Sequence, residues 1–397
     1  MRVLYVQPGH GIGGAKISLA RLLCTLPDTQ TSLIALSSPA DRHYKQMLDG
    51  LVEKVHELWL PGWIKGPKQN LHQRMRHTLS LVRRGWYIAP SMHLARLIRQ
   101  EHIDLVHTNS VVTPVGAIAA RLAGRPHIWH VREPVGCERQ FPLAPGDWFS
   151  ARLFKYLSRE IICNSRYTAA FFRRHGIQPR VIYNGLDIKQ FENGNLRGCQ
   201  LRCSLGLQQE TIVIAMVGSL RAAWKEHDVF LRVASALKDR HPGCQFVLFG
   251  GSSDMNVTPY TRSLQEMASA LGLADRLAWV GFIDDVPAMM HSFDIMVHPT
   301  SNEGSGRVVM EAMAAGKPVV GVRAGGVQEL IQDGLTGFLV PPGNVKALSS
   351  AIDQLIIAPS LRSHVGAQAQ TYARNHFSDD RTTAAIQNLY AEVMNRR

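Results

Sequence analysis

Two acidic residues in the stretch HPTSNEGSGRVVMEAMAAGKPVVG, residues 298–321, are spaced for sugar recognition. Glu303 and Glu311 are eight positions apart, and a carboxylate pairs well with neighbouring hydroxyls because both of its oxygens accept hydrogen bonds. Glu303 follows the apolar strand IMVHPT in a predicted loop, and residues 307–315 read as a helix that carries Glu311 beyond its first turn. We therefore expect Glu303 to reach a sugar from the loop and Glu311 to reach a ribose from the helix.

The segment between these glutamates suits an anionic ligand. Gly304, Ser305 and Gly306 free the backbone to approach a ligand, and Arg307 begins the helix. Backbone N–H groups at the start of a helix favour a diphosphate. The alternative is that the two glutamates are ordinary surface residues.

The start of the chain contains a second glycine pattern. Gly9, Gly11 and Gly14 form G-x-G-x-x-G after an apolar strand, which is how a dinucleotide-binding turn is written. That site needs an acid at the end of the second strand, but the first acid after TSLIAL is Asp41, beyond SSPA. NAD is therefore not favoured. Gly13 and Gly14 still let the backbone pass close to a phosphate or sugar, or they form a tight turn without a ligand.

Short apolar strands alternate with helical patterns along the whole chain. The strands are apolar on both faces, as in a buried parallel sheet. The predicted strands are RVLYV, TSLIAL, DLVHTN, PHIWHV, EIICNS and RVIYNG in the first half and TIVIAMVG, QFVLFGG, RLAWVGF, IMVHPT, PVVGV and GFLVPP in the second. In the second half, helices are expected to begin near Lys225, Thr258, Asp284, Gly306 and Gly326.

This pattern predicts an α/β protein with two doubly wound, Rossmann-like domains. We place an N-terminal, acceptor-binding domain at residues 1–190 and a C-terminal, donor-binding domain at 191–378, with a polar seam over 187–210. A last helix at 379–397 is expected to pack back on the N-terminal domain. Because ligands of such sheets lie beyond the carboxyl ends of the strands, the cleft between the domains is the expected site.

The segment 298–321 resembles the signature of the family 4 (GT4) glycosyltransferases, which are retaining enzymes of the GT-B fold. The resemblance continues through AGGVQELIQDGLTGFLVPPGN and back through WVGFIDDVPAMMHSFDIMVHPT. It implies transfer of a sugar from a nucleotide-diphosphate sugar, without a metal or other cofactor. It also implies that the leaving phosphate takes the proton of the acceptor, and the acceptor would be a glycan or a lipid-linked molecule.

The same resemblance assigns roles around the donor. MVGSLRAAWKEHDVFL resembles the loop that holds the diphosphate, with Lys225 as one cation and Arg221 as the other, since Ser219 stands where many relatives carry arginine. Glu226 replaces a frequent glycine. The nucleotide base would lie near Gly251 and Phe282, and the glycines of AGGVQEL would support the donor loop.

In the first half, the resemblance singles out PHIWHVREPVG. His130 ends a predicted strand and would hydrogen-bond a sugar hydroxyl; the alternative is a buried core histidine. Arg132 would bind the acceptor or pair with Glu133, and Gly13 and Gly14 would let the acceptor-side loop approach.

The net charge of +13 lies entirely in the first half: residues 1–200 hold 27 Lys and Arg against 13 Asp and Glu. A helix predicted from Asn70 aligns an apolar stripe with flanking arginines. It could lie on an anionic membrane, or pack its stripe on the core. An acidic polysaccharide would explain the charge equally well, whereas no nucleic-acid module is recognisable.

The chain has six scattered cysteines without a C-x-x-C pair, and it has no apolar run long enough to span a bilayer. These features predict a cytoplasmic protein, and peripheral attachment to the inner face of the membrane stays open. Two rival functions also stay open. A nucleotide-sugar epimerase of similar architecture would act without an acceptor. A non-catalytic sugar-nucleotide or glycan-binding protein would release no nucleoside diphosphate.

Overall fold

The computed structural model describes residues 1–9, 13–27, 30–37, 39–64, 87–136, 142–143, 146–220, 223–250 and 258–396. The chain divides into two compact units. Unit 1 comprises Met1–Gly185 and Asp379–Arg397, and unit 2 comprises Leu186–Ser378. The last helix of the chain thus belongs to the N-terminal unit.

Unit 1 is built on a sheet with the strand order β3-β2-β1-β4-β5-β6-β7, in which every pairing is parallel. The strands are β1 Arg2–Gln7, β2 Thr31–Ser37, β3 Lys54–Leu58, β4 Leu105–Asn109, β5 His127–Val131, β6 Glu160–Cys163 and β7 Arg180–Val181. The helices are α1 Gly14–Cys24, α2 Arg42–Met47, α4 Ile88–Gln100, α5 Val115–Ala123, α6 Asp147–Leu157, α7 Arg166–Arg174 and α16 Asp379–Asn395.

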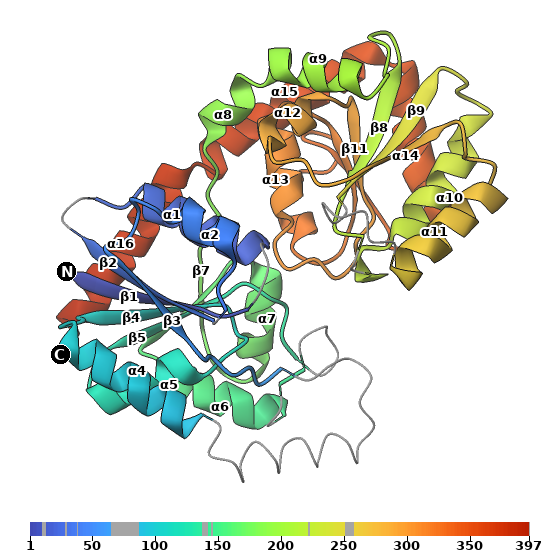
Figure 1. Ribbon diagram of the computed structural model, residues 1–397. Coiled ribbons are helices and arrows are strands. Elements are labelled where there is room, and N and C mark those ends of the chain that lie inside the picture. The colour runs from blue at the N-terminus through green and yellow to red at the C-terminus, as the bar shows by residue number, and fades with distance from the viewer. Residues whose placement is uncertain are drawn as a thin grey trace. The chain divides into compact units, whose positions relative to one another are not determined.

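Helices cover both faces of this sheet, with α1, α2 and α16 on one side and α4, α5 and α6 on the other (Figure 1). The alternation of side chains along β1 explains why both faces need cover. Val3 and Tyr5 pack into the core beneath α1 and α16, whereas Leu4 and Val6 pack beneath α4 and α5. A strand that is apolar on both faces can be buried only between two layers of helices.

Unit 2 repeats this plan with the parallel strand order β10-β9-β8-β11-β12-β13. The strands are β8 Ile212–Val217, β9 Cys244–Phe249, β10 Leu277–Val280, β11 Ile295–His298, β12 Val319–Val322 and β13 Phe338–Val340. The helices are α8 Ile188–Glu192, α9 Asn195–Ser204, α10 His227–Lys238, α11 Pro259–Ala270, α12 Val286–His291, α13 Arg307–Ala314, α14 Val345–Ile357 and α15 Pro359–His376, with 3-10 turns η1 Ala223–Lys225 and η2 Val327–Glu329.

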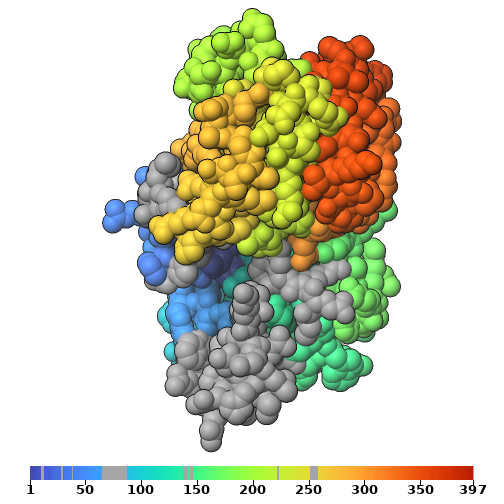
Figure 2. All heavy atoms as spheres, turned by 90° about the vertical axis from the view of Figure 1, so that its right-hand side faces the viewer, coloured from blue at the N-terminus to red at the C-terminus, as the bar shows by residue number. Residues whose placement is uncertain are grey.

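One face of the unit 2 sheet is covered by α10, α11 and α14. Figure 2 shows α10 between α11 and α14 on the surface of this unit. Beneath them, Ile214 and Met216 of β8 pack against Phe230 of α10 and Leu348 of α14 in one buried cluster. The predicted fold class, two doubly wound α/β domains, is confirmed in both units, whereas the cleft between the domains stays a prediction.

Several predicted boundaries differ from the structure. The polar seam at 187–210 is folded into α8 and α9 of unit 2, and the unit boundary falls at Gly185 rather than at residue 190. The polar sequence predicted a linker, but α9 packs on α12 through few apolar side chains. Gly198 is so close to His291 that a Cβ on Gly198 would lie 2.3 Å from the Cβ of His291. The helix expected near Gly326 is only the short turn η2.

The strand β3 was missed, because its sequence KVHEL is polar at the edge of the sheet, where alternate residues face solvent. The basic helix predicted from Asn70 lies outside the described residues. Within the part of the chain that the structure describes, no helix combines the length and the apolar character needed to cross a bilayer.

Candidate functional site

The loops that carry the candidate site residues of unit 2 follow β8 and β11. These strands are neighbours in the sheet, although their last residues, Val217 and His298, lie far apart in the sequence. Both loops therefore leave the same edge of the sheet. The strand order reverses between these two strands, and parallel α/β sheets bind ligands at the carboxyl ends of such a pair. The first loop carries Lys225 and the second carries Glu303.

The side chains of Lys225 and Glu303 form an ion pair in this region, with Nζ 2.5 Å from Oε2. Both are mostly buried, with 14% and 15% of the side chain exposed. The fully buried ring of His298, the last residue of β11, places Nε2 3.8 Å from the same carboxylate oxygen. Neither ring nitrogen of His298 has a hydrogen-bond partner among the described residues.

Two hydrogen bonds between a side chain and a backbone group also join the loops. The Thr300 hydroxyl donates to the carbonyl oxygen of Lys225 at 2.9 Å, and the Ser301 N–H donates to the Glu226 carboxylate at 2.8 Å. Glu226 has a φ of 60°, a left-handed conformation that favours glycine. The glycine that the family resemblance leads us to expect here would adopt this conformation without strain, and in this chain the side chain of Glu226 makes a compensating bond.

The electrostatic balance keeps Glu303 ionised. Burial would raise the pKa of Glu303, but the charges of Lys225 and His298, together with hydrogen bonds from Lys225 and the backbone of Gly306, lower it below its ordinary value. Burial lowers the pKa of His298 to about 4; Glu303 opposes this shift and Lys225 adds to it. The site therefore offers a carboxylate acceptor and an ammonium group beside a neutral imidazole.

The neutral state of His298 predicts a pH dependence of stability. The pKa of His298 in the folded protein, about 4, lies below the ordinary value of 6.5. The contribution of the neutral ring to the free energy of unfolding is therefore complete above pH 6.5 and is lost as the pH falls towards 4. Between these pH values, this effect should lower the free energy of unfolding of the wild type by an amount on the order of 3 kcal/mol. His298→Asn should not show this part of the decrease. The measurement is the urea midpoint at both pH values.

The exposed His364 supplies the matched control, since His364→Asn should keep the wild-type pH dependence. The other buried histidines contribute equally to wild type and variants, so the comparison isolates position 298. An unchanged pH dependence in His298→Asn would contradict the neutral state.

The loop from Ser301 to Gly306 is held by the glycine pair at 325–326. The N–H of Gly326 donates to the Glu303 carbonyl oxygen at 2.8 Å. A Cβ on Gly325 would lie 2.7 Å from the same oxygen, and one on Gly326 would lie 2.4 Å from the Gly304 oxygen. Glycine is required at both positions because the two backbones touch.

Gly326→Ala should therefore displace the Glu303 loop. We expect a loss of about 1–3 kcal/mol in the free energy of unfolding, typical of overpacking, measured by urea denaturation. Gly243→Ala is the matched control, because a Cβ there meets no atom within 4 Å. Equal stability of the two variants would argue against this support of the Glu303 loop.

Glu311 lies on α13, which begins at Arg307, as predicted. The Arg307 Nε donates to Glu311 Oε1 at 2.8 Å, so these two predicted donor-binding residues are paired one turn apart. Glu311 is 6% exposed. Its contact with a ribose stays a prediction.

Three other predicted donor residues follow β8, β9 and β10 in the sequence. Arg221 and Gly251 lie outside the described residues. Phe282 follows β10 and is 51% exposed. Next to it, a Cβ on Gly250 would lie 2.4 Å from the Gly218 oxygen, so the backbones that follow β8 and β9 are in close contact.

In unit 1, His130 lies near the end of β5 and is 1% exposed. Its Nδ1 lies 3.2 Å from His107 Nε2 and 3.4 Å from Arg132 Nη2, whereas its Nε2 has no hydrogen-bond partner among the described residues. Arg132 is also buried, and it donates to the side-chain oxygens of Asn109 and Asn184. His130 is thus buried, and its Nε2 is a buried atom without a hydrogen-bond partner among the described residues; its contact with a sugar stays a prediction.

The predicted pairing of Arg132 with Glu133 takes a different form. Glu133 accepts hydrogen bonds from the Ser110 hydroxyl at 2.6 Å and from the backbone N–H groups of Val111 and Arg132. Burial raises the pKa of Glu133, although these bonds and the Arg132 charge oppose the shift. The Arg132 guanidinium itself contacts the two asparagines.

The predicted acceptor-side glycines lie at the start of α1. Gly13 is the residue before the helix, and Gly14 is its first residue. A Cβ on either glycine would meet no atom within 4 Å. The space beside this turn is compatible with a ligand, and the role of Gly13 and Gly14 in acceptor binding stays a prediction.

Sequence reasoning gave no role to His298 or His107. His298 had a signal, because it is a polar residue at the end of an otherwise apolar strand that leads to Glu303. His107 had none, since its partners come from β5 and α16.

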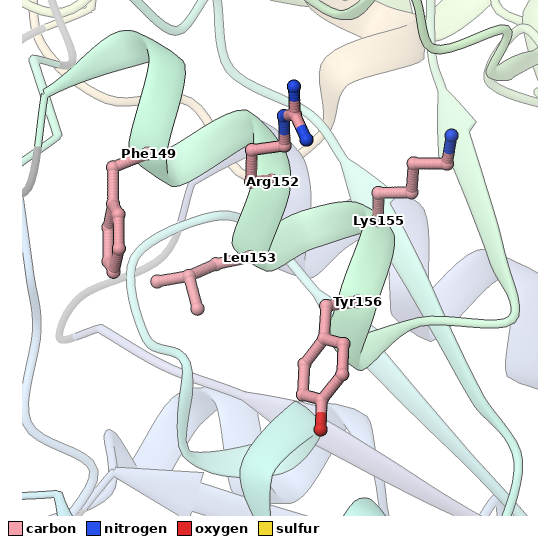
Figure 3. Close-up of a pocket in the computed structure, with 5 residues that line it drawn as sticks. All are labelled: Phe149, Arg152, Leu153, Lys155 and Tyr156. Carbon is pink, nitrogen blue, oxygen red and sulfur yellow. The ribbon is translucent and has the colours of Figure 1, made fainter.

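A surface hollow of about 620 Å³ lies elsewhere, on α6 of unit 1. Figure 3 shows the side chains of Phe149, Leu153 and Tyr156 on one side of this helix and those of Arg152 and Lys155 on the other. None of the predicted site residues lines it.

Comparison with known families divides the chain in the same way as the fold. Residues 12–190 match the model described as Glycosyltransferase Family 4, and residues 200–372 match the one described as Glycosyl transferases group 1. The second region contains Lys225, Glu303 and Glu311.

Two curated relatives are named D-inositol 3-phosphate glycosyltransferase. The protein of Salinispora tropica is 29% identical over 74% of this chain and 64% of its own length. That of Salinispora arenicola is 28% identical over 98% of this chain and 89% of its own length. The chain thus spans less than two thirds of the first relative.

Among solved structures, Alr3699/HepE of Anabaena in complex with UDP and glucose has a TM-score of 0.81 and 26% sequence identity. The match covers 99% of this chain and all of that one.

Proposed function

The chain belongs to the family 4 glycosyltransferases of the GT-B fold, and from this premise we propose that it is a retaining, metal-independent glycosyltransferase. A sugar would pass from a nucleotide-diphosphate sugar to a glycan or lipid-linked acceptor in the synthesis of a cell-surface polysaccharide or glycolipid. The bond from the anomeric carbon to the phosphate breaks, and a bond to the acceptor oxygen forms on the same face. The leaving phosphate takes the acceptor proton.

The single observation that carries this proposal is the buried Lys225–Glu303 pair at the carboxyl ends of β8 and β11. In the proposed complex, Lys225 and Arg221 offset the negative charge that develops on the leaving diphosphate. The Glu303 carboxylate accepts hydrogen bonds from the transferred sugar. Glu311 holds the ribose, and the backbone N–H groups at the start of α13 face the diphosphate.

Unit 1 contributes a second contact in this proposal. His130 forms a hydrogen bond with a hydroxyl of the transferred sugar through Nε2, the ring atom that has no partner among the described residues. Gly13, Gly14 and Arg132 are assigned to the acceptor.

The experiment is an assay of nucleoside diphosphate release. Because HepE was solved with UDP and glucose, UDP-glucose is the first donor to test, followed by other UDP- and GDP-sugars, each with glycan and lipid-linked acceptors. We expect acceptor-dependent release, unaffected by EDTA, and a product with the donor's anomeric configuration by NMR. Interconversion of the free donor would indicate an epimerase, and binding without release would indicate a binding protein.

We also propose that unit 1 lies on an anionic membrane surface, and α6 supports this. Trp148 and Tyr156 are each 63% exposed. The guanidinium of Arg152 lies 4.7 Å from the Trp148 ring, and that of Arg121 lies 4.3 Å from the Tyr156 ring. Exposed aromatic rings beside basic groups suit the headgroup region of a bilayer.

Liposome co-sedimentation tests this membrane contact. Pelleting should require anionic lipid and should fall in Trp148→Ser. Equal, negligible pelleting with neutral and anionic vesicles would overturn it. Binding to an acidic polysaccharide instead would favour the alternative partner for the basic first half.

A further inference from the structure

A buried chain of polar side chains links the C-terminal helix to His130. The Tyr390 hydroxyl on α16 lies 2.6 Å from Nδ1 of His107 on β4. On its other side, Nε2 of His107 lies 3.2 Å from Nδ1 of His130 on β5. Tyr390 also donates to the hydroxyl oxygen of Tyr5 on β1 at 3.2 Å. These four side chains are at most 1% exposed, and all of them belong to unit 1.

The direction of each bond follows from counting protons. A phenol has one proton, and that of Tyr390 goes to Tyr5. Its oxygen can then only accept from His107, so the single proton of a neutral His107 lies on Nδ1. The bare Nε2 of His107 must accept in turn, so the proton of a neutral His130 also lies on Nδ1.

Both rings are neutral, which this count requires. Burial lowers the pKa of His107 and of His130 well below the ordinary value, and the nearby charge of Arg132 adds to both shifts. Each ring therefore carries one proton, and placing it on one nitrogen leaves a lone pair on the other.

Arg132 provides the competing influence. Its Nη2 lies 3.4 Å from His130 Nδ1, and donation there would require the opposite tautomer, with the proton on Nε2. That contact is longer than the 2.8 Å bond from Arg132 Nε to Asn109 and longer than the 3.2 Å bond between the two histidines. The shorter bonds form a consistent chain that ends at Tyr5.

We propose that Tyr390 and His107 are positioning residues that fix His130 in the Nδ1–H tautomer and present its Nε2 as a hydrogen-bond acceptor. The ligand group would be a sugar hydroxyl that donates its proton. This identification of the ligand rests on the proposed function, whereas the tautomer does not. Recognition by an acceptor atom selects a hydroxyl and rejects a group that cannot donate.

Nitrogen-15 NMR of the full chain with labelled histidine tests the tautomer without any ligand. The His130 resonances are assigned by their loss in His130→Gln. In the wild type, Nδ1 should be protonated and Nε2 bare; a protonated Nε2 would overturn the proposal, whether or not any variant folds.

Two tyrosine variants test the cause. Tyr390→Phe removes the acceptor for His107 Nδ1–H, so the His107 proton can move to Nε2 and His130 should change to the Nε2–H tautomer. Tyr44→Phe is the matched control, because the buried Tyr44 hydroxyl donates to the Lys16 carbonyl oxygen at 3.3 Å and takes no part in this chain of side chains. An unchanged tautomer in Tyr390→Phe would assign control of His130 to another group and overturn the role of Tyr390.

Fluorinated donors test the consequence. UDP-glucose analogues with each glucose hydroxyl replaced in turn by fluorine cannot donate at that position. For the hydroxyl facing His130, the wild type should lose about tenfold or more in kcat/KM, and Tyr390→Phe should lose markedly less. The loss at a hydroxyl facing Glu303 should persist in both proteins. An equal loss at every hydroxyl in both proteins would overturn the acceptor role.

These outcomes separate the two proposals. The expected tautomer without turnover of any nucleotide sugar would reject the proposed function and leave the positioning roles standing. Turnover of a nucleotide sugar by a protein whose His130 is protonated on Nε2 would support the proposed function and reject the positioning roles.

Discussion

Replacing Glu303 with glutamine lowers kcat by about a hundredfold or more while the fold is kept. The carboxylate accepts charge-assisted hydrogen bonds from the transferred sugar, and such bonds are worth about 1.5–3 kcal/mol each. An amide loses the charge and leaves the buried ammonium of Lys225 without its partner 2.5 Å away. Misplacement of the sugar adds to the loss, because transfer depends on orientation. Steady-state kinetics with UDP-glucose, or with the best donor found, measures the change.

Two further variants sharpen this test. Glu210→Gln changes an exposed glutamate of the same unit and should leave kcat and KM as in the wild type. Glu311→Gln should raise the donor KM with little change in kcat, because a ribose contact is made equally in the ground state and the transition state. Wild-type kcat in Glu303→Gln would remove this residue from the site.

Lys225→Met should raise the donor KM about tenfold or more and lower the affinity for UDP. An ammonium beside a diphosphate contributes on the scale of a charged hydrogen bond, and methionine keeps the length of the side chain without the charge. Calorimetric titration with UDP measures the binding step without chemistry.

The same variant should change the pH profile through Glu303. In the wild type, Lys225 is one of the groups that lower the pKa of Glu303 against the effect of burial. Without that charge the pKa rises, so the acid limb of kcat/KM moves to higher pH. Lys346→Met, at an exposed lysine of the same unit, should move neither the KM nor the acid limb. An unmoved acid limb in Lys225→Met would show that this pair does not control the ionisation of Glu303.

The site could be predicted where local pattern decides it. Glu303 in a loop and Glu311 inside a helix follow from a strand, a glycine-bearing turn and a helical period within one short segment, and the structure has both as expected. His130 at the end of β5 follows from the same logic. The predicted ligand contacts of these residues await the experiments above.

The partners of these residues could not be predicted in this way. Lys225 is 78 positions from Glu303, and Tyr390 is 283 positions from His107. No local pattern encodes such a separation. The polar stretch that was predicted as a seam is helical for a related reason, since α9 is stabilised by its close contact with α12 rather than by an apolar stripe of its own.

The sequence by itself determined the two doubly wound sheets, because strands apolar on both faces must be buried between layers of helices. It also determined which residues lie at the carboxyl ends of those strands. Only the tertiary structure decided that Lys225 and Glu303 form a buried pair, and that the C-terminal helix returns to place Tyr390 against His107 in unit 1. The physical reason is that side-chain periodicity reports which face of an element is buried, whereas the identity of the group that covers it depends on the order in which distant strands join the sheet.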